Sequence, residues 1–117
     1  MPRFCANLTM LFNEVEFLDR FEKAASAGFK GVEYLFPYAW KKEQLAEKLV
    51  AHGLTQVLHN LPAGDWNAGE RGIACIPGRE AEFQDGVGRA IEYANALKCS
   101  QLNCLVGLTP KNAPAEK

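Results

Sequence analysis

Residues 31–61 read GVEYLFPYAWKKEQLAEKLVAHGLTQVLHNL, and this stretch decides the fold class. Its two ends, residues 31–36 and 55–61, are short apolar runs with the length of buried strands. Between them, residues 41–52 have the apolar spacing of an amphipathic helix, and Gly53 follows where such a helix would end. A strand, a helix and a second strand in this order predict a right-handed βαβ unit with two parallel strands.

The same alternation continues on both sides of this unit. Upstream, residues 4–8 predict a strand and residues 13–28 a helix, because Asn13 followed by Glu16 resembles a helix start. Downstream, residues 101–106 predict a fourth strand. Before that strand, a stripe at helical spacing predicts a third helix with a buried face formed by Phe83, Val87, Ala90, Ile91, Ala94 and Leu97. The sequence therefore predicts an α/β fold with a parallel sheet.

Two parallel architectures compete for this pattern: a small open flavodoxin-like sheet and part of a closed (β/α)8 barrel. No glycine-rich phosphate loop follows the first strand, and Gly86 and Gly88 fall inside the third predicted helix. A flavodoxin-like domain also needs a fifth strand. An open sheet of four parallel strands would expose long apolar edges, which proteins normally avoid. The pattern is that of an unfinished sheet.

Composition excludes several classes of protein. Apolar residues make up 48% of the chain, which is enough to stabilise one folded domain. The length of 117 residues is too short for two domains. Thirteen basic and fourteen acidic residues give a net charge of -1, so we expect neither nucleic acid nor an anionic membrane as partner. No apolar stretch approaches the roughly 18 residues of a membrane span, and the first residues lack the pattern of an export signal. We expect a cytoplasmic protein.

The four cysteines and two histidines do not form a recognisable metal or disulfide framework. No Cys-x-x-Cys pair occurs, and neither histidine has zinc-finger spacing from a cysteine pair. We therefore predict no metal ligands in this chain.

Polar residues at the carboxyl ends of the predicted strands are the first candidates for a binding site, because ligands of parallel α/β folds lie at that edge. They are Asn7, Glu33, His59 and Asn60. Glu33 lies in an apolar run, so its carboxylate either pairs with a neighbouring basic or amide group and ties strands together, or has a direct role with a substrate or metal. His59 is either a hydrogen-bonded core histidine or a substrate ligand, and Asn60 either satisfies loop backbone or binds a substrate hydroxyl.

Residues 62–79 form a polar connection far longer than the usual βα loop of about 2–6 residues. Loops of this length are commonly binding loops or lids, and this one is predicted to lie on the ligand face. Its Arg71 and Arg79 either bind a small carboxylate substrate or hold the loop to its own acidic residues.

This loop, LPAGDWNAGERG at residues 61–72 followed by IPGRE at residues 76–80, strongly resembles the hydroxypyruvate isomerase family. Residues 4–12, 31–38 and 90–97 match the same family. The resemblance implies a xylose-isomerase-like (β/α)8 TIM barrel that interconverts hydroxypyruvate and tartronate semialdehyde. It also implies that residues 1–117 are a single partial domain, the amino-terminal half of the barrel, with residues 62–79 as a loop on the active-site face and 109–117 as a polar tail.

The resemblance places the catalytic glutamates beyond Lys117, so no catalytic residue and no cofactor is expected in this chain; a divalent metal, Mg or Mn, would belong to the full-length enzyme. Two hypotheses follow. In the first, the chain is the substrate-binding half of an isomerase for a small hydroxy-oxo acid, inactive by itself, or of a related sugar epimerase or isomerase. In the second, it is a non-catalytic half-barrel module that self-associates or pairs with a missing carboxyl-terminal half.

Overall fold

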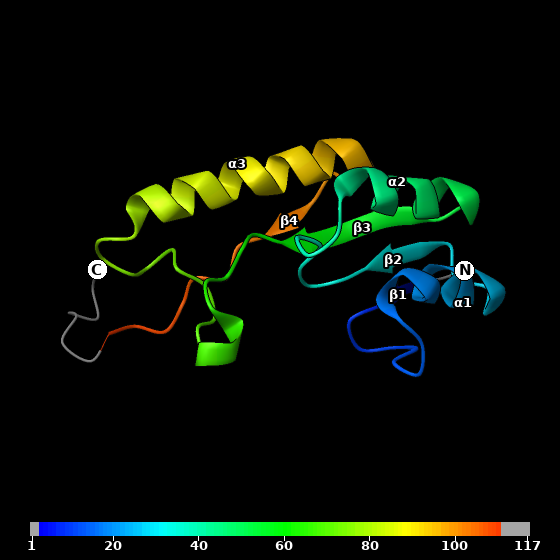
Figure 1. Ribbon diagram of the computed structural model, residues 1–117, viewed down its shortest axis with the longest axis horizontal. Helices are drawn as coiled ribbons and strands as arrows, with labels where there is room; N and C mark the ends of the chain where they lie inside the picture. Colours follow the sequence, from blue (N-terminus) through cyan, green and yellow to red (C-terminus); the bar gives the residue numbers. More distant parts are fainter. Residues whose placement is uncertain (1–2, 111–117) are drawn as a thin grey trace.

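The computed structural model describes residues 3–110, and its centre is a sheet of four parallel strands in the order β1-β2-β3-β4. The strands are β1 (Cys5–Asn7), β2 (Gly31–Glu33), β3 (Thr55–Asn60) and β4 (Leu102–Asn103). Each neighbouring pair is joined by a helical crossover, as the βαβ interpretation predicted (Figure 1). All four strands are shorter than the apolar runs from which they were predicted, because these runs continue into the loops at the carboxyl ends of the strands.

Three helices follow the first three strands: α1 (Arg20–Ser26), α2 (Lys42–Ala51) and α3 (Glu80–Leu97). A short 3-10 helix, η1 (Phe17–Asp19), precedes α1. Figure 1 shows α2 and α3 lying next to each other on one side of the sheet. None of the helices among residues 3–110 is long and apolar enough to cross a bilayer.

The core lies between the helices and one face of the sheet. Alternate strand residues point into it, as the period of two requires. Ala6, Leu8 and Val32 are fully buried there. They pack with helix residues of the same cluster, among them Phe21, Ala24, Leu45, Leu49, Ala94 and Leu97. The remaining strand residues, among them Asn7 and Glu33, face the other side of the sheet, which we call its inner face.

The structure corrects two details of the predicted helices. The chain becomes helical only at Phe17, where η1 begins, and α1 begins at Arg20. Asn13 does not cap a helix; its side-chain amide donates to the carbonyl of Met10 at 2.9 Å. In α3, Ile91 is 46% exposed and Tyr93 takes the buried place beside Ala90 and Ala94. Of the predicted stripe, Ala90, Ala94 and Leu97 are buried, whereas Phe83 and Val87 are only half-buried.

The connection from β3 to α3 is a long loop that includes residues 62–79. It contains one 3-10 turn, η2 (Trp66–Ala68), and Gly72 forms an antiparallel bridge with Val106 beyond β4. The loop and the segment after β4 therefore extend together from the sheet (Figure 1). Of the predicted tail 109–117, residues 111–117 lie outside the described residues.

Candidate functional site

A cavity of about 310 Å³ lies against the inner face of the sheet, at the carboxyl ends of its strands. Three of the predicted site residues line it: Asn7 from β1, Glu33 from β2 and Asn60 from β3. Asn103 from β4 and Trp66 from the long loop also line it, and the rest of the lining is formed by Tyr34, Leu35, Leu58 and Leu105. Every strand of the sheet therefore contributes one polar side chain to a single rim.

The strand register explains why these side chains meet. Asn7 pairs with Glu33 across β1 and β2. Between β2 and β3 the register shifts: Val32 pairs with Gln56, but Glu33 pairs with Leu58. This irregularity adds one residue to β3, as a β-bulge does. The residue that follows two positions after Leu58, Asn60, is consequently on the same face as Glu33.

Hydrogen bonds orient the amides of this rim. The Asn103 side-chain amide donates to the Asn60 side-chain oxygen at 3.0 Å, which leaves the amide nitrogen of Asn60 as a donor for another group. The Asn7 side-chain oxygen accepts from the backbone N–H of Thr9 at 3.0 Å. Glu33 forms no ion pair with any residue of 3–110. The rim thus offers amide donors and one carboxylate acceptor to a small polar ligand.

The Cys5 thiol lies on the same inner face, two residues before Asn7. Burial raises its pKa to about 11, and the nearby Glu33 carboxylate adds to the effect by repelling a thiolate. Cys5 therefore stays protonated at neutral pH and is a poor nucleophile.

His59 does not join this rim, although the sequence suggested it as a substrate ligand. Adjacent strand residues point to opposite faces, so Asn60 facing the cavity forces His59 toward the helices. There it is fully buried, and its Nε2 lies 3.3 Å from the carbonyl oxygen of Ala90 in α3. Burial lowers the pKa of the imidazole. The sequence left two interpretations of His59, a core histidine and a substrate ligand. Its position matches that of a hydrogen-bonded core histidine.

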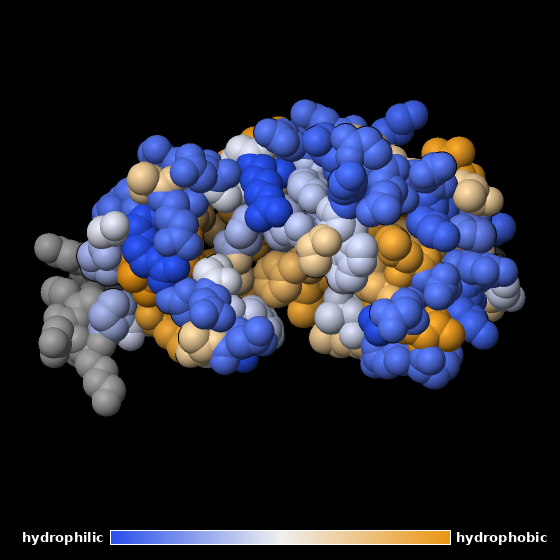
Figure 2. Space-filling view, viewed as in Figure 1, coloured by the Kyte–Doolittle hydropathy of each residue, from blue (hydrophilic) through white to orange (hydrophobic). Residues whose placement is uncertain are grey.

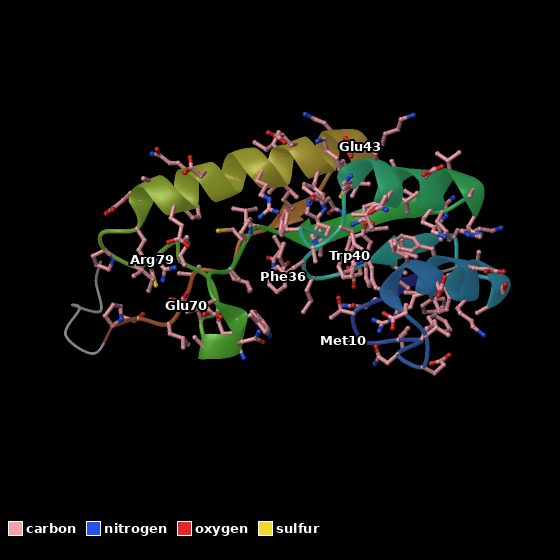
Figure 3. All side chains as sticks on the ribbon, in the orientation of Figure 1. Met10, Phe36, Trp40, Glu43, Glu70 and Arg79 are labelled. Atoms are coloured by element: carbon pink, nitrogen blue, oxygen red, sulfur yellow. The ribbon has the colours of Figure 1, made fainter. Side chains whose placement is uncertain are left out.

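Arg79 also lies apart from the cavity, at the N-terminus of α3. Its guanidinium donates to both carboxylate oxygens of Glu70 in the loop and, at 2.9 Å, to both of Glu82 in α3. Figure 3 shows Glu70 and Arg79 next to each other at the end of the loop. The Arg79 guanidinium lowers the pKa of the Glu70 carboxyl. Arg79 therefore holds the loop to α3, and the structure does not bring it to the predicted carboxylate site.

Arg71 borders the cavity only through another residue. Its guanidinium carbon lies 3.8 Å from the centre of the Trp66 ring, and Nη1 donates to the carbonyls of Trp66 and Glu70 at 2.9 and 2.8 Å. Both hydrogen bonds of Arg71 that the structure shows therefore stay within the loop. Substrate binding by Arg71 and Arg79 stays a prediction that this geometry does not support.

Sequence reasoning missed Trp66 and Asn103. Asn103 could have been found, because it lies in the fourth predicted strand, as Asn7 and Asn60 lie in the first and third. Nothing in the sequence of the loop signals that Trp66 turns back onto the cavity.

The described residues do not fit a metal ion. Among residues 3–110, no group of three or more histidine, cysteine, aspartate or glutamate side chains lies close enough together to hold one. Glu33 is the one carboxylate that lines the cavity within this part of the chain.

Comparisons with known proteins agree with the half barrel. The profile of the Xylose isomerase-like TIM barrel family matches residues 21–117. The chain belongs to this family. A crystal structure of a family 2 AP endonuclease from Brucella melitensis superposes on 95% of the chain with a TM-score of 0.93 and 57% identity, over 43% of its own length. The probable 3-DHS dehydratase AsbF of Bacillus anthracis, at 13% identity and a TM-score of 0.61, shares the fold over 86% of the chain.

Curated relatives of this TIM-barrel chain are isomerases. Hydroxypyruvate isomerase of Escherichia coli is 61% identical over all 117 residues, and 2-oxo-tetronate isomerase of Cupriavidus necator is 52% identical over 113 residues, 97% of the chain. These matches cover 45% and 44% of the two relatives. The chain therefore spans just under half the length of the isomerases that it resembles.

Proposed function

We propose that the chain forms the substrate-binding half of an isomerase that interconverts hydroxypyruvate and tartronate semialdehyde. The observation that carries the proposal is the 61% identity to the hydroxypyruvate isomerase of Escherichia coli along the whole chain. The cavity supports it, because its volume of about 310 Å³ and its polar rim suit a small hydroxy-oxo acid.

The rim residues would bind and orient such a substrate. The amides of Asn7 and Asn60 can donate to its carboxylate or carbonyl oxygens, and the Glu33 carboxylate can accept from its hydroxyl. Moving a proton between adjacent carbons requires a base and a stabiliser for the enediol oxygen. Glu33 is a single carboxylate and does not supply both, so the proposal assigns proton transfer to groups outside this chain.

A second substrate follows from the second relative. The 2-oxo-tetronate isomerase of Cupriavidus necator is 52% identical over nearly the same residues, and its substrate by name has one carbon more than hydroxypyruvate. Comparing turnover of the two compounds decides between them.

The edges of the sheet at β1 and β4, which we call its flanks, favour binding of a partner. We propose that this partner is the remaining part of a (β/α)8 barrel. Within residues 3–110, β1 and β4 each pair with another strand on one side only. Next to β1, a cavity of about 810 Å³ is lined by Phe4, Leu11 and Phe29. Beyond β4, Val106 and Leu108 are 61% and 64% exposed. Relatives with about twice the length have the residues to cover these flanks.

Complementation tests both proposals. The chain is produced together with a second segment, the part of Escherichia coli hydroxypyruvate isomerase that does not align with this chain. We expect a one-to-one complex with hydroxypyruvate isomerase activity and no turnover by either part alone. A purified complex that forms but turns over neither hydroxypyruvate nor 2-oxo-tetronate would contradict the function, and the lack of any complex would contradict the partner.

Within the active complex, Glu33→Gln tests the rim. It keeps the shape of the side chain but removes a charged acceptor, so we expect KM to rise roughly tenfold, the cost of about one hydrogen bond to a charged group. Glu92→Gln makes the same change on the exposed face of α3 and should leave KM unchanged.

A further inference from the structure

The loop between β3 and α3 brings an indole to the wall of the cavity. Trp66, the first residue of η2, lines the cavity together with Asn60 and Asn103. The edge of its ring meets Phe36, with ring centroids 5.0 Å apart and planes at 62°. Phe36 follows β2 and lies at the end of the sheet that faces the loop (Figure 3). An edge-to-face contact of this kind fixes the direction of both rings.

Arg71 contacts the same indole. Its guanidinium lies over the ring at 3.8 Å, within the distance of a strong cation–π interaction. The two hydrogen bonds from its Nη1 to the carbonyls of Trp66 and Glu70 prevent the guanidinium from turning away. We call Phe36, Trp66 and Arg71 the indole stack.

The backbone of the turn is held independently of these side chains. The Asp65 carboxylate accepts from the backbone N–H of Ala68 at 3.2 Å, and Gly69 ends the turn with a φ of 98°, which favours glycine. The Glu70 carboxylate accepts from the backbone N–H of Asp65 at 2.6 Å. The position of the main chain of Trp66 is therefore set before any ligand binds, and the direction of its indole depends on the stack.

We propose that the Trp66 indole contacts the bound substrate and limits its size, and that Arg71 is a positioning residue that acts through the indole. The substrate class, a small hydroxy-oxo acid, rests on the proposed function. Amide and carboxylate groups hold the polar atoms of the substrate at the rim, while the flat apolar ring covers its carbon chain and excludes water. Arg71 does not line this cavity, so it acts on the substrate through the indole that it covers.

Fluorescence tests the positioning without any substrate. The chain has two tryptophans, so a Trp66→Phe variant, which retains Trp40, gives the emission to be subtracted. In Arg71→Met, which keeps the length of the side chain but removes the guanidinium, we expect acrylamide quenching of Trp66 to rise. Arg89→Met is the matched control, because Arg89 lies over Tyr38 at 4.9 Å and donates to its carbonyl on the helix side of the sheet. It should leave Trp66 unchanged.

Kinetics of the complemented enzyme test the contact with substrate. Arg71→Met should raise KM for hydroxypyruvate roughly two- to fivefold, the equivalent of one partly exposed cation–π contact, with a smaller change in kcat. Trp66→Leu should raise kcat/KM for 2-oxo-tetronate relative to hydroxypyruvate by roughly tenfold, because the enlarged cavity accepts an additional carbon. A merely structural role of either residue would lower the active fraction, and so kcat, with KM unchanged.

Three outcomes overturn the proposal: unchanged quenching of Trp66 in Arg71→Met, an unchanged KM in that variant, or the same substrate ratio in Trp66→Leu. A complex without any isomerase activity contradicts the proposed function instead, and the quenching experiment then still decides whether Arg71 positions the indole.

Discussion

His59 makes the stability of the chain depend on pH. Its imidazole is fully buried between the sheet and α3, and burial lowers its pKa below the ordinary value of 6.5. Between the folded pKa and 6.5 the unfolded chain binds more protons than the folded chain, so stability is complete above 6.5 and falls as the pH drops through this window. We expect urea unfolding at pH values from about 7.5 down to 5 to show this loss, and His59→Gln to flatten the slope.

His52→Gln is the matched control for this measurement, because His52 is the other histidine and lies half-buried at the C-terminal end of α2. The control should retain the pH dependence of the parent chain. Equal slopes for the parent chain and His59→Gln would show that His59 does not carry the effect.

The same residue shows how far sequence reasoning reaches at this scale. His59 and Asn60 were both expected at the binding edge, yet neighbours in a strand cannot face the same side. The alternation alone would have separated them. It could not have said which of the two faces the cavity, because that depends on the register shift opposite Val32 and Glu33, which the sequence does not signal.

Gly72 joins the long loop to the segment after β4, and we expect it to tolerate no side chain. Its φ is 107°, and a Cβ would overlap the carbonyl oxygen of Leu105. Both the backbone strain and the overlap destabilise the folded chain, so Gly72→Ala should lower the free energy of unfolding by about 2–3 kcal/mol. Gly78→Ala is the control: φ is 86° there too, but nothing lies within 4 Å of its Cβ, and only the strain, about 1 kcal/mol, applies. Equal losses in the two variants would contradict the close approach to Leu105.

The pair of Glu70 and Arg79 holds the other end of the loop, and we expect its removal to loosen the loop alone. Glu70→Gln weakens the bonds to Arg79, so backbone amides of residues 62–79 should exchange hydrogen several-fold faster, while those of α3 keep their protection. In the parent chain the lowered pKa of Glu70 predicts the same loosening as the pH falls below its ordinary value of 4.5. Glu92→Gln, an exposed change on α3, should have no effect. Faster exchange throughout α3 would instead show that the pair stabilises the helix.

Elements that bury an apolar face could be predicted from the sequence, and those fixed by loops could not. α2 was predicted almost to the residue, because its apolar spacing and Gly53 agree on where it lies. The expected helix start at Asn13 was wrong, since its short-range pattern also fits the loop that the chain forms there. The length of the loop at 62–79 predicted that it was special, but its contacts with Val106 connect segments more than thirty residues apart.

At the scale of the whole molecule, the half barrel has two kinds of exposed apolar residue, and only one kind is expected to bind a partner. Figure 2 shows hydrophobic surface both in the hollowed middle of the molecule and among the hydrophilic residues that cover the rest of this face. Phe4 is 73% exposed, directly precedes β1 at one edge of the described sheet, and lines the cavity of about 810 Å³ next to this strand. Val50, 83% exposed, is on α2 next to the solvent-facing residues of that helix. The exposed fractions of Phe4 and Val50 do not distinguish the two residues. Their positions do, because Phe4 is next to the edge strand β1 and Val50 is on a helix.

Phe4→Ser should therefore weaken the one-to-one complex between this chain and the complementary segment, whereas Val50→Ser should not. Burying a phenylalanine contributes about 1.5–3 kcal/mol, so we expect the dissociation constant to rise by roughly one to two orders of magnitude in Phe4→Ser. Titration calorimetry of the two variants against the same segment measures the difference, and unfolding in urea checks that both variants remain folded. Equal affinities would show that the β1 flank does not form the contact. The barrel would then have to close at the β4 side alone, where Val106 and Leu108 are the exposed apolar residues.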